Sequence, residues 1–379
     1  MAGRFAMAVC VVAVLVVPTS VTSQEIPSAV DLLRESQYDL SGDGMGFLLD
    51  EARQAAFFLL GEVHFSNEIP ELLRELWPDL WASGYRHVAA EMSPWMARRV
   101  EFPAGGESVP PFFGLWTVPE VELVTGLKEK GAEPVLWGTD LEVLSPHLVV
   151  RALAVEHPEN PHLQAMVEAT AGGYRRSLAP ALAESLGKAA SVQPLLAEEL
   201  HSYVNLAHTF AVEADRLDGN RLRASARREE AMKELFVSHY RTHAADTSAR
   251  VLARLGRNHL HRGIDRRGVS TLGNFIAEMA AARGLSSFHV AAFAAGGRLR
   301  AGLATVDADE TGNDPALELL ASVGMYAATV FDLRPVRPEL HRVPAGERSP
   351  TERSLLYWAD SYDAIICFRE VTPLRIGVR

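Results

Sequence analysis

Short apolar runs alternate with amphipathic stretches in the first third of the chain. Residues 55–60, 87–90 and 134–138 are apolar runs of the length and composition typical of buried strands. Between the first two runs, residues 66–84 place apolar side chains at helical spacing, with Pro70 in the first turn and a kink or restart predicted at Pro78. Strands joined by helical crossovers favour a parallel sheet.

The pattern changes in the middle of the chain and then returns. Residues from about 146 to 247 are rich in Ala, Leu, Glu and Arg and contain no strand-like run, which predicts a helical insertion, or cap. Residues 334–350, rich in Pro, Arg and Glu, are predicted to form a surface loop. Later strands are expected at residues 249–255, 287–293, 327–331 and 364–368, with a helix at 272–282. The predicted fold class is therefore α/β, with a mostly parallel sheet flanked by helices.

The amino terminus has the layout of a secretory signal peptide. One positive residue, Arg4, precedes an apolar run at residues 5–17, and small polar residues follow up to Ser23. The run is shorter than the roughly 20 residues that span a bilayer as a helix, so no stable membrane anchor is expected. We expect cleavage before Gln24, a secreted or periplasmic protein, and a single α/β domain over residues 24–379.

Composition narrows the range of partners. The chain has 37 Lys and Arg against 48 Asp and Glu, a formal net charge of -11, and no dense basic stripe. The positive surface that attracts phosphate backbones is missing, so nucleic acid is not an expected partner. Of the two cysteines, Cys10 lies in the signal segment and Cys367 in an apolar run, so the mature fold cannot depend on an internal disulfide.

Acids and imidazoles follow four of the predicted strands. Glu62 and His64 come after the first strand, Glu91 ends the second, Asp140 follows the third, and His259 follows the strand at 249–255. In open parallel sheets, functional groups gather beyond the carboxyl ends of the strands. We therefore expect these side chains to share one site.

Two other patterns are weaker signals. His239 and His243 have the i, i+4 spacing of zinc-binding helices, but Tyr240 stands where a zincin has Glu, so both histidines are assigned to a solvated helix face. The chain has no Gly-x-Ser-x-Gly elbow, and Cys367 lies in a strand, so a serine or cysteine nucleophile is not supported.

Several segments, in order, resemble the erythromycin esterase-like, Tiki and ChaN superfamily. The opening motif is matched by residues 61–68 (Gly-Glu-Val-His-Phe-Ser-Asn-Glu), and the later motifs by 89–91 (Ala-Ala-Glu), 138–140 (Gly-Thr-Asp), 228–232 (Arg-Glu-Glu-Ala-Met) and 256–259 (Gly-Arg-Asn-His). One residue separates Glu62 from His64, as in Tiki and ChaN proteins, whereas the esterases usually have two. Arg74 approximates the arginine that the esterases use downstream of the histidine. The resemblance implies a site of Glu62, His64, Arg74, Glu91, Asp140, Arg228 and His259.

These residues suit hydrolysis of an ester or amide bond in a small-molecule or peptide substrate. A neutral His64 can take a proton from water, with Glu62 or Glu91 orienting the ring. His259 is a second acid–base candidate, and Arg74 or Arg228 could stabilise an oxyanion.

Two alternatives stay open. Tiki proteins are metal-dependent, and His64, Glu91 and His259 would suit a divalent metal ion with an open position. ChaN-type relatives are associated with haem and iron uptake, so the main alternative is a haem-binding protein without catalytic activity, with Tyr85, His87, His239 and His243 as candidate ligands. Substrate specificity is expected from the insertion and from residues 103–117, where Phe112, Phe113, Leu115 and Trp116 suggest an apolar rim.

Overall fold

A computed structural model describes residues 28–102, 118–130, 134–143, 145–192, 196–244, 249–301 and 304–375. The predicted signal peptide and the apolar rim at residues 103–117 lie outside the described residues. No helix in the described part of the chain is long and apolar enough to cross a membrane.

The centre of the molecule is an eight-stranded sheet in the order β1-β9-β10-β6-β2-β5-β3-β4. All neighbouring strands are parallel except at β9, which runs antiparallel to both β1 and β10. The strands are β1 (Gln37–Asp39), β2 (Phe57–Glu62), β3 (Tyr85–Ala90), β4 (Leu136–Gly138), β5 (Arg250–Gly256), β6 (Ser287–Ala294), β9 (Ala328–Asp332) and β10 (Ala364–Phe368). A separate hairpin pairs β7 (Arg298–Ala301) with β8 (Ala304–Asp307). The prediction of a mostly parallel α/β sheet is confirmed.

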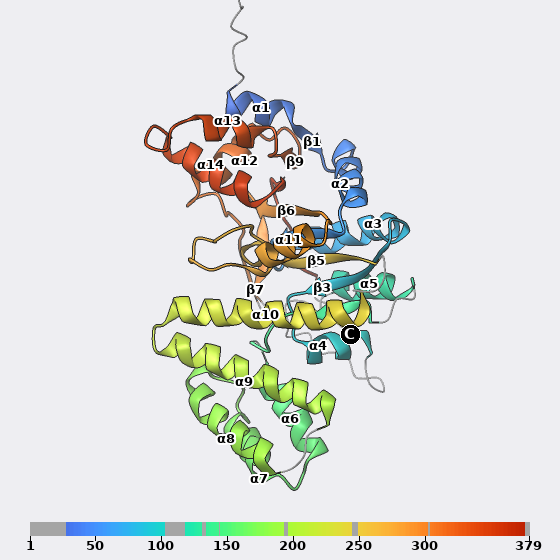
Figure 1. The fold of residues 1–379 in the computed structure, drawn as a ribbon, viewed down its shortest axis with the longest axis vertical. Helices are drawn as coiled ribbons and strands as arrows, with labels where there is room; N and C mark the ends of the chain where they lie inside the picture. Colours follow the sequence, from blue (N-terminus) through green and yellow to red (C-terminus); the bar gives the residue numbers. More distant parts are fainter. Residues whose placement is uncertain are drawn as a thin grey trace, which may run out of the picture.

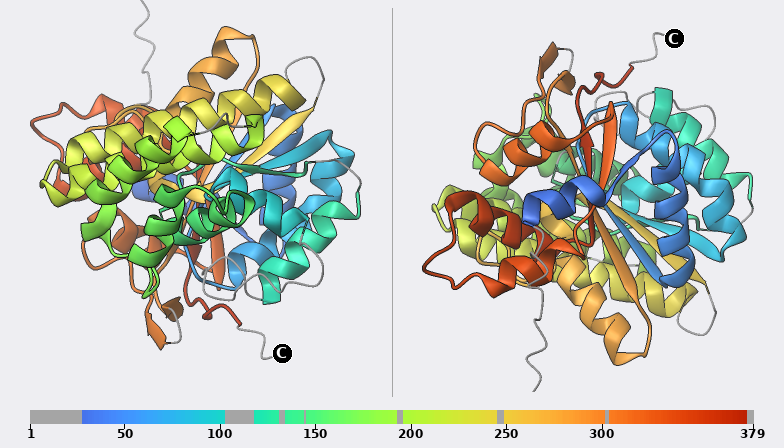
Figure 2. Two further views of the ribbon diagram at one scale, coloured as in Figure 1. Left: turned by 90° about the horizontal axis from the view of Figure 1, so that it is seen from below. Right: turned by 90° about the horizontal axis from the view of Figure 1, so that it is seen from above.

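Helices cover both faces of the sheet (Figures 1 and 2). Because side chains alternate along a strand, Phe58 and Leu60 of β2 face one layer while Phe57 and Leu59 face the other. The first layer contains α2 (Asp43–Gln54), α3 (Glu68–Ala82), α4 (Pro94–Glu101) and α5 (Val118–Lys128). The opposite layer contains α11 (Leu272–Ala282) near β5, and α1 (Ala29–Glu35), α12 (Pro315–Val323), α13 (Val336–Arg342) and α14 (Pro350–Ser361) near β9 and β10.

The predicted helical insertion lies between β4 and β5. It comprises α6 (Pro146–Glu156), α7 (Pro161–Ala169), α8 (Ala179–Val192), α9 (Ala197–Leu217) and α10 (Arg221–His243), with a short 3-10 turn before α8. The first four helices enclose a core of their own, in which Leu163, Leu206 and Phe210 are fully buried. The long helix α10 lies between that core and the sheet, where its Phe236 packs against Phe57 and Trp137 (Figure 1). In this way α10 brings the insertion to the strand ends.

At Pro78, where a kink or a restart was predicted, helix α3 does not restart but continues to Ala82, because its apolar face is buried against the sheet and this packing outweighs one lost backbone hydrogen bond. The prediction for residues 334–350 was wrong. Residues 334–350 are not only a loop, since they contain α13, whose Val336 and Leu340 are buried in the core with α14. Because residues 334–350 are mostly polar, the sequence pattern did not indicate that Val336 and Leu340 are buried.

Candidate active site

Four adjacent strands, β2, β5, β3 and β4, end at the same edge of the sheet. In the register of the ladders, Glu62 lies opposite Gly256, and Ala90 lies opposite both Arg254 and Gly138. The residues that follow these ends, which are far apart in sequence, therefore meet. Glu62, His64, Glu91, Asp140 and His259 all lie at this edge.

A continuous chain of contacts links two imidazoles through one carboxylate. His64 Nδ1 lies 2.9 Å from Glu62 Oε1, and His64 Nε2 lies 3.5 Å from Glu91 Oε2. On the other side, His259 Nε2 lies 3.4 Å from Glu91 Oε1, and His259 Nδ1 lies 2.6 Å from Glu229 Oε1. Each imidazole thus has a carboxylate on Nδ1 and turns its Nε2 toward Glu91.

Two buried arginines hold the carboxylates in place. Arg228, from α10, donates to Glu91 Oε1 at 2.8 Å and, through Nε, to Asp140 Oδ1 at 2.9 Å. Arg254, from β5, donates to Glu62 and, through Nη1, to Glu120 Oε2 at 2.7 Å. Charge-assisted hydrogen bonds of this kind fix both geometry and ionisation state. Each guanidinium group is paired with two carboxylates, Arg228 with Glu91 and Asp140 and Arg254 with Glu62 and Glu120, and so positions them.

The two histidines differ in their access to solvent. The His64 side chain is 39% exposed, whereas that of His259 is 6% exposed. His64 lies on the loop after β2, next to Phe65, whose φ of 68° is in the left-handed region that non-glycine residues rarely adopt. Such strain, typically about 1–3 kcal/mol, persists where the surrounding structure enforces it. The backbone oxygen of Phe65 accepts hydrogen bonds from Arg300 and Leu374, and these bonds hold the loop.

The electrostatics keep Glu62 and Glu91 ionised. Burial alone would raise the pKa of each carboxyl, but the neighbouring cations reverse this effect. Arg254 and His64 lower the pKa of Glu62, while His259, His64 and Arg228 hold the pKa of Glu91 well below its usual range. Both carboxylates are therefore negative at neutral pH.

The pKa values of the two imidazoles are raised, whereas those of the two carboxyls are lowered. Burial lowers the pKa of His259, but Glu91 and Glu229 outweigh burial and the repulsion of Arg228 and raise it to about 9. Burial also opposes protonation of His64, yet the hydrogen bond to Glu62 and the charge of Glu91 raise its pKa above the ordinary value. The buried His259 is thus an imidazolium at neutral pH, and the accessible His64 titrates above its ordinary range.

Gly256 makes room for this arrangement. A Cβ atom at this position would lie 2.5 Å from His64 Nε2, which would force the ring to move, and 3.1 Å from Glu91 Oε2, which is a tight contact. The backbone N–H of Gly256 donates to Glu91 Oε2 at 2.7 Å. The glycine therefore both admits the His64 ring and orients Glu91.

Arg74 is not part of the site, in contrast to the expectation from the resemblance. It lies on α3, its side chain is 45% exposed, and it pairs with Glu122 of α5 at 2.6 Å. Arg254 is the arginine that contacts Glu62 instead. Since Leu72 and Leu73 are buried on the sheet-facing side of α3, helix geometry turns Arg74 to the surface.

Three contributors were missed by sequence reasoning: Glu229, Arg254 and Glu120. Glu229 follows Arg228 directly and lies in a motif that had already been recognised. Arg254 is the one charge within the apolar run 251–255 of β5, which is a signal of a buried partner. Glu120 had no signal, because nothing in the sequence places α5 beside β5.

The histidine pair of α10 is not on a solvated face. His239 and His243 are half-buried near the indole of Trp137, and the His239 ring stacks on it at a centroid distance of 5.7 Å. Burial lowers the pKa of His239 to about 4, so this ring is neutral. The solvated-face assignment was therefore wrong.

Tyr85 and His87, two of the candidate haem ligands, are buried and hydrogen-bonded within the fold. Tyr85 is fully buried and its hydroxyl donates to the backbone oxygens of Ala52 and Ala55. His87 is buried, lies 2.8 Å from the Pro134 oxygen through Nδ1 and stacks on Trp137. Neither side chain is presented on a broad apolar surface of the kind that haem requires.

A divalent cation does not fit the cluster of His64, Glu91 and His259 as it is arranged. Both oxygens of Glu91 already accept hydrogen bonds, Oε1 from Arg228 and Oε2 from Gly256. A cation would also have to displace the Arg228 guanidinium from Glu91. The donor atoms of the three side chains do not converge within 4.8 Å of one another. We therefore derive no chemical step through a metal ion.

Comparisons with known proteins identify the fold. No family model and no curated protein matches the sequence. Among solved structures, a mutant of the erythromycin esterase EreC in its open conformation is similar, with a TM-score of 0.59, 16% identity, and coverage of 92% of this chain and 97% of that one. A succinoglycan biosynthesis protein (TM-score 0.59, 14% identity) and a protein from Bacillus cereus (TM-score 0.59, 12% identity) match over 92% of this chain and 98% of each of theirs. The chain has the fold of these three structures.

Proposed function

We propose that this protein is a hydrolase of the erythromycin esterase-like, Tiki and ChaN superfamily, which cleaves an ester or amide bond with water activated at His64. The observation that carries the proposal is the chain Glu62–His64–Glu91–His259–Glu229, in which two imidazoles with different access to solvent share one carboxylate. The fold shared with an erythromycin esterase supports the class of chemistry and leaves the substrate open.

His64 acts as the general base in this proposal. Glu62 accepts a hydrogen bond from the Nδ1–H group of His64. The neutral ring therefore has its lone pair on Nε2, with which it can take a proton from water. The oxygen of that water attacks the carbonyl carbon of the substrate, and the carbonyl oxygen becomes an oxyanion. Glu91 stabilises the His64 imidazolium that results.

His259 acts as the electrophilic partner. With a pKa raised to about 9 it carries a proton on Nε2, which can be donated to the oxyanion or to the leaving group. When the tetrahedral intermediate collapses, the bond to the leaving alkoxide or amine breaks and that group takes a proton from an imidazolium. In this proposal Arg228 and Arg254 hold the carboxylates in place.

The test compares His64→Ala with His341→Ala on a panel of ester and amide substrates. His341 is an exposed imidazole paired with Asp360 at 2.8 Å on α13, away from the cluster. We expect His64→Ala to lose about 10²–10⁴-fold in rate, the usual contribution of a positioned base. His341→Ala should keep the wild-type rate.

Circular dichroism provides the folding control for both variants. Equal activity of the wild type and His64→Ala at matched stability would refute the role of His64. Addition of a chelator during the assay separates this mechanism from a metal-dependent one, because the proposed reaction should proceed at an unchanged rate.

A further inference from the structure

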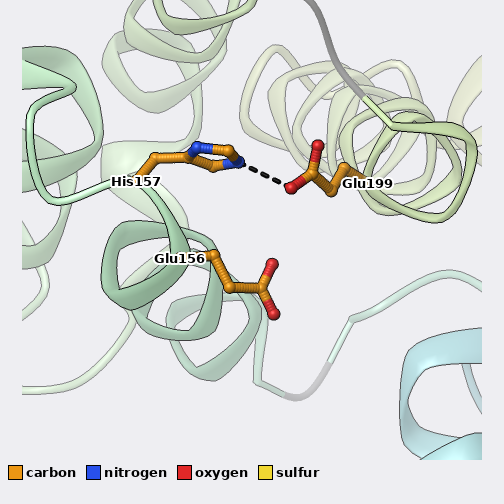
Figure 3. A group of neighbouring side chains, drawn as sticks. All are labelled: Glu156, His157 and Glu199. Carbon is orange, nitrogen blue, oxygen red and sulfur yellow. Dashed lines mark hydrogen bonds and ion pairs between the residues drawn. The ribbon is translucent and has the colours of Figure 1, made fainter.

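A second group of potential ligands lies in the helical insertion, away from the cluster at the strand ends. Glu156 is the last residue of α6, His157 is the C-cap residue that follows it, and Glu199 lies in the first turn of α9. One donor atom from each side chain lies within 4.8 Å of the other two. Figure 3 shows the imidazole and the two carboxylates directed toward a common space.

The two inner donors are fixed in position. His157 Nε2 lies 2.7 Å from Glu199 Oε1, and the other oxygen of Glu199 accepts the backbone N–H of Leu196 at 2.7 Å. The backbone N–H of His157 donates to the Leu153 oxygen, which anchors the residue at the end of α6. An imidazole nitrogen and a carboxylate oxygen are thus held together by two separate helices.

A further carboxylate lies near the imidazole. The carboxylate of Glu159 lies 3.8 Å from His157 Nδ1, which is an ion-pair distance and too long for a hydrogen bond. An ion bound to His157 Nε2 would take the place of the hydrogen that now joins this nitrogen to Glu199 Oε1. Arg98 and Arg99 line the adjoining cavity, so the three neighbouring donor atoms, and not the net charge, point to a cation.

The group opens onto a cavity of about 920 Å³ between α4, α6 and α9. Glu156 and Glu199 both line that cavity, and the side chains of His157 and Glu199 are only 15% and 11% exposed. A site with three protein ligands on its inner side and open space on the other leaves positions for water or for a ligand donor.

We propose that Glu156, His157 and Glu199 bind a divalent cation of the Zn²⁺ type, which links α6 to α9 and presents an open coordination position to the cavity. An imidazole with two carboxylates is a ligand set that suits Zn²⁺. The proposal does not depend on the hydrolase function, because none of these three residues belongs to the contact chain Glu62–His64–Glu91–His259–Glu229.

The experiment is a calorimetric titration of tag-free full-length protein with Zn²⁺ after removal of metal by a chelator. We expect a binding event of one ion per chain that His157→Ala weakens by more than about tenfold, since loss of even an outer-shell partner typically costs about 10–100-fold in affinity. His341→Ala is the matched control. It also removes an imidazole paired with a carboxylate at 2.8 Å, but that pair is solvent-exposed and belongs to no three-donor group.

Two further variants separate the outcomes. Glu156→Gln, at an exposed position at the end of its helix, should weaken binding as His157→Ala does and keeps the test valid if His157→Ala fails to fold. His64→Ala should bind Zn²⁺ as the wild type does. Absence of a stoichiometric event in the wild type, or unchanged binding in both His157→Ala and Glu156→Gln, would overturn the proposal. So would loss of the event in His64→Ala, because the ion would then belong to the strand-end cluster.

Discussion

At the scale of single residues, Gly256 sets the distance between the base and its carboxylate. Replacing it with Ala would place a methyl group 2.5 Å from His64 Nε2. We expect Gly256→Ala to reduce hydrolysis about tenfold to a hundredfold, because a displacement of about 1 Å in an active site can cost about 10²-fold. Rate measurements at matched protein stability test this expectation.

The control for that variant is Gly46→Ala. Gly46 lies in α2, where an added Cβ would meet nothing within 4 Å. In a helix interior Ala is favoured over Gly by roughly 0.5–1 kcal/mol. Gly46→Ala should therefore be slightly more stable and fully active, and a similar loss of activity in both variants would contradict the crowding argument.

Arg254 is the residue on which two buried carboxylates depend. Its loss in Arg254→Met would remove the guanidinium from the buried Glu62 and Glu120 and leave Glu62 with His64 alone. Removing one partner of a buried ion pair typically costs about 3–5 kcal/mol, and urea unfolding would measure this loss. Arg342→Met, which removes an exposed arginine from its pair with Glu339, should stay within about 0.5 kcal/mol of the wild type.

The charge state of His259 makes stability depend on pH. Its pKa is raised from 6.5 to about 9 on folding, so its imidazolium stabilises the native state fully below pH 6.5 and this stabilisation is lost as the pH rises through about 9. Chemical unfolding of the wild type and of His259→Gln across pH 6–10 tests the assignment. The difference in unfolding free energy between the two should shrink over that interval, and a difference that does not change with pH would exclude a buried imidazolium.

At the scale of elements, the sequence predicted the site better than it predicted the surroundings of the site. Strand ends could be placed because apolar runs are short and because parallel strands bring their carboxyl ends to one edge. Strand register could not be read from an apolar run. Yet register is what places Leu60 opposite Arg254, and with side chains alternating along each strand this puts Glu62 and Arg254 on the same face.

Helix phase explains the error at Arg74, and packing against another element explains the error at α10. The periodicity of α3 already directs Arg74 away from the buried side that carries Leu73, so the family motif conflicted with the local pattern. The histidines of α10 were assigned to solvent because a polar side chain at helical spacing is usually exposed. Trp137 of β4, which no pattern connects to α10, covers them instead.

The contact between His239 of α10 and Trp137 of β4 predicts a loss of stability when the imidazole is removed. His239 lies 3.2 Å from the Gly138 oxygen through Nε2 and stacks on Trp137. We expect His239→Ala to lower the unfolding free energy by about 1–2 kcal/mol, within the range usual for a half-buried contact that includes a hydrogen bond. His162→Ala, on the short helix α7 of the insertion, has no such aromatic contact in the described residues and should cost less; equal losses would show that the stacking contributes nothing.

At the scale of the whole molecule, export remains a prediction from the amino-terminal pattern. If residues 1–23 are a cleaved signal, the protein recovered from the exported fraction should begin near Gln24. Mass spectrometry of the intact chain measures this directly. Membrane-bound material that still begins at Met1 would contradict it.

Both edges of the large sheet are short. The outermost strands, β1 and β4, span only Gln37–Asp39 and Leu136–Gly138. Long exposed edges are templates on which other chains can add strands, and very short edge strands are one way in which native proteins avoid this association. A second molecule would find few backbone groups with which to extend either ladder. The sheet that assembles the site is thereby protected against edge-to-edge aggregation when the protein is concentrated.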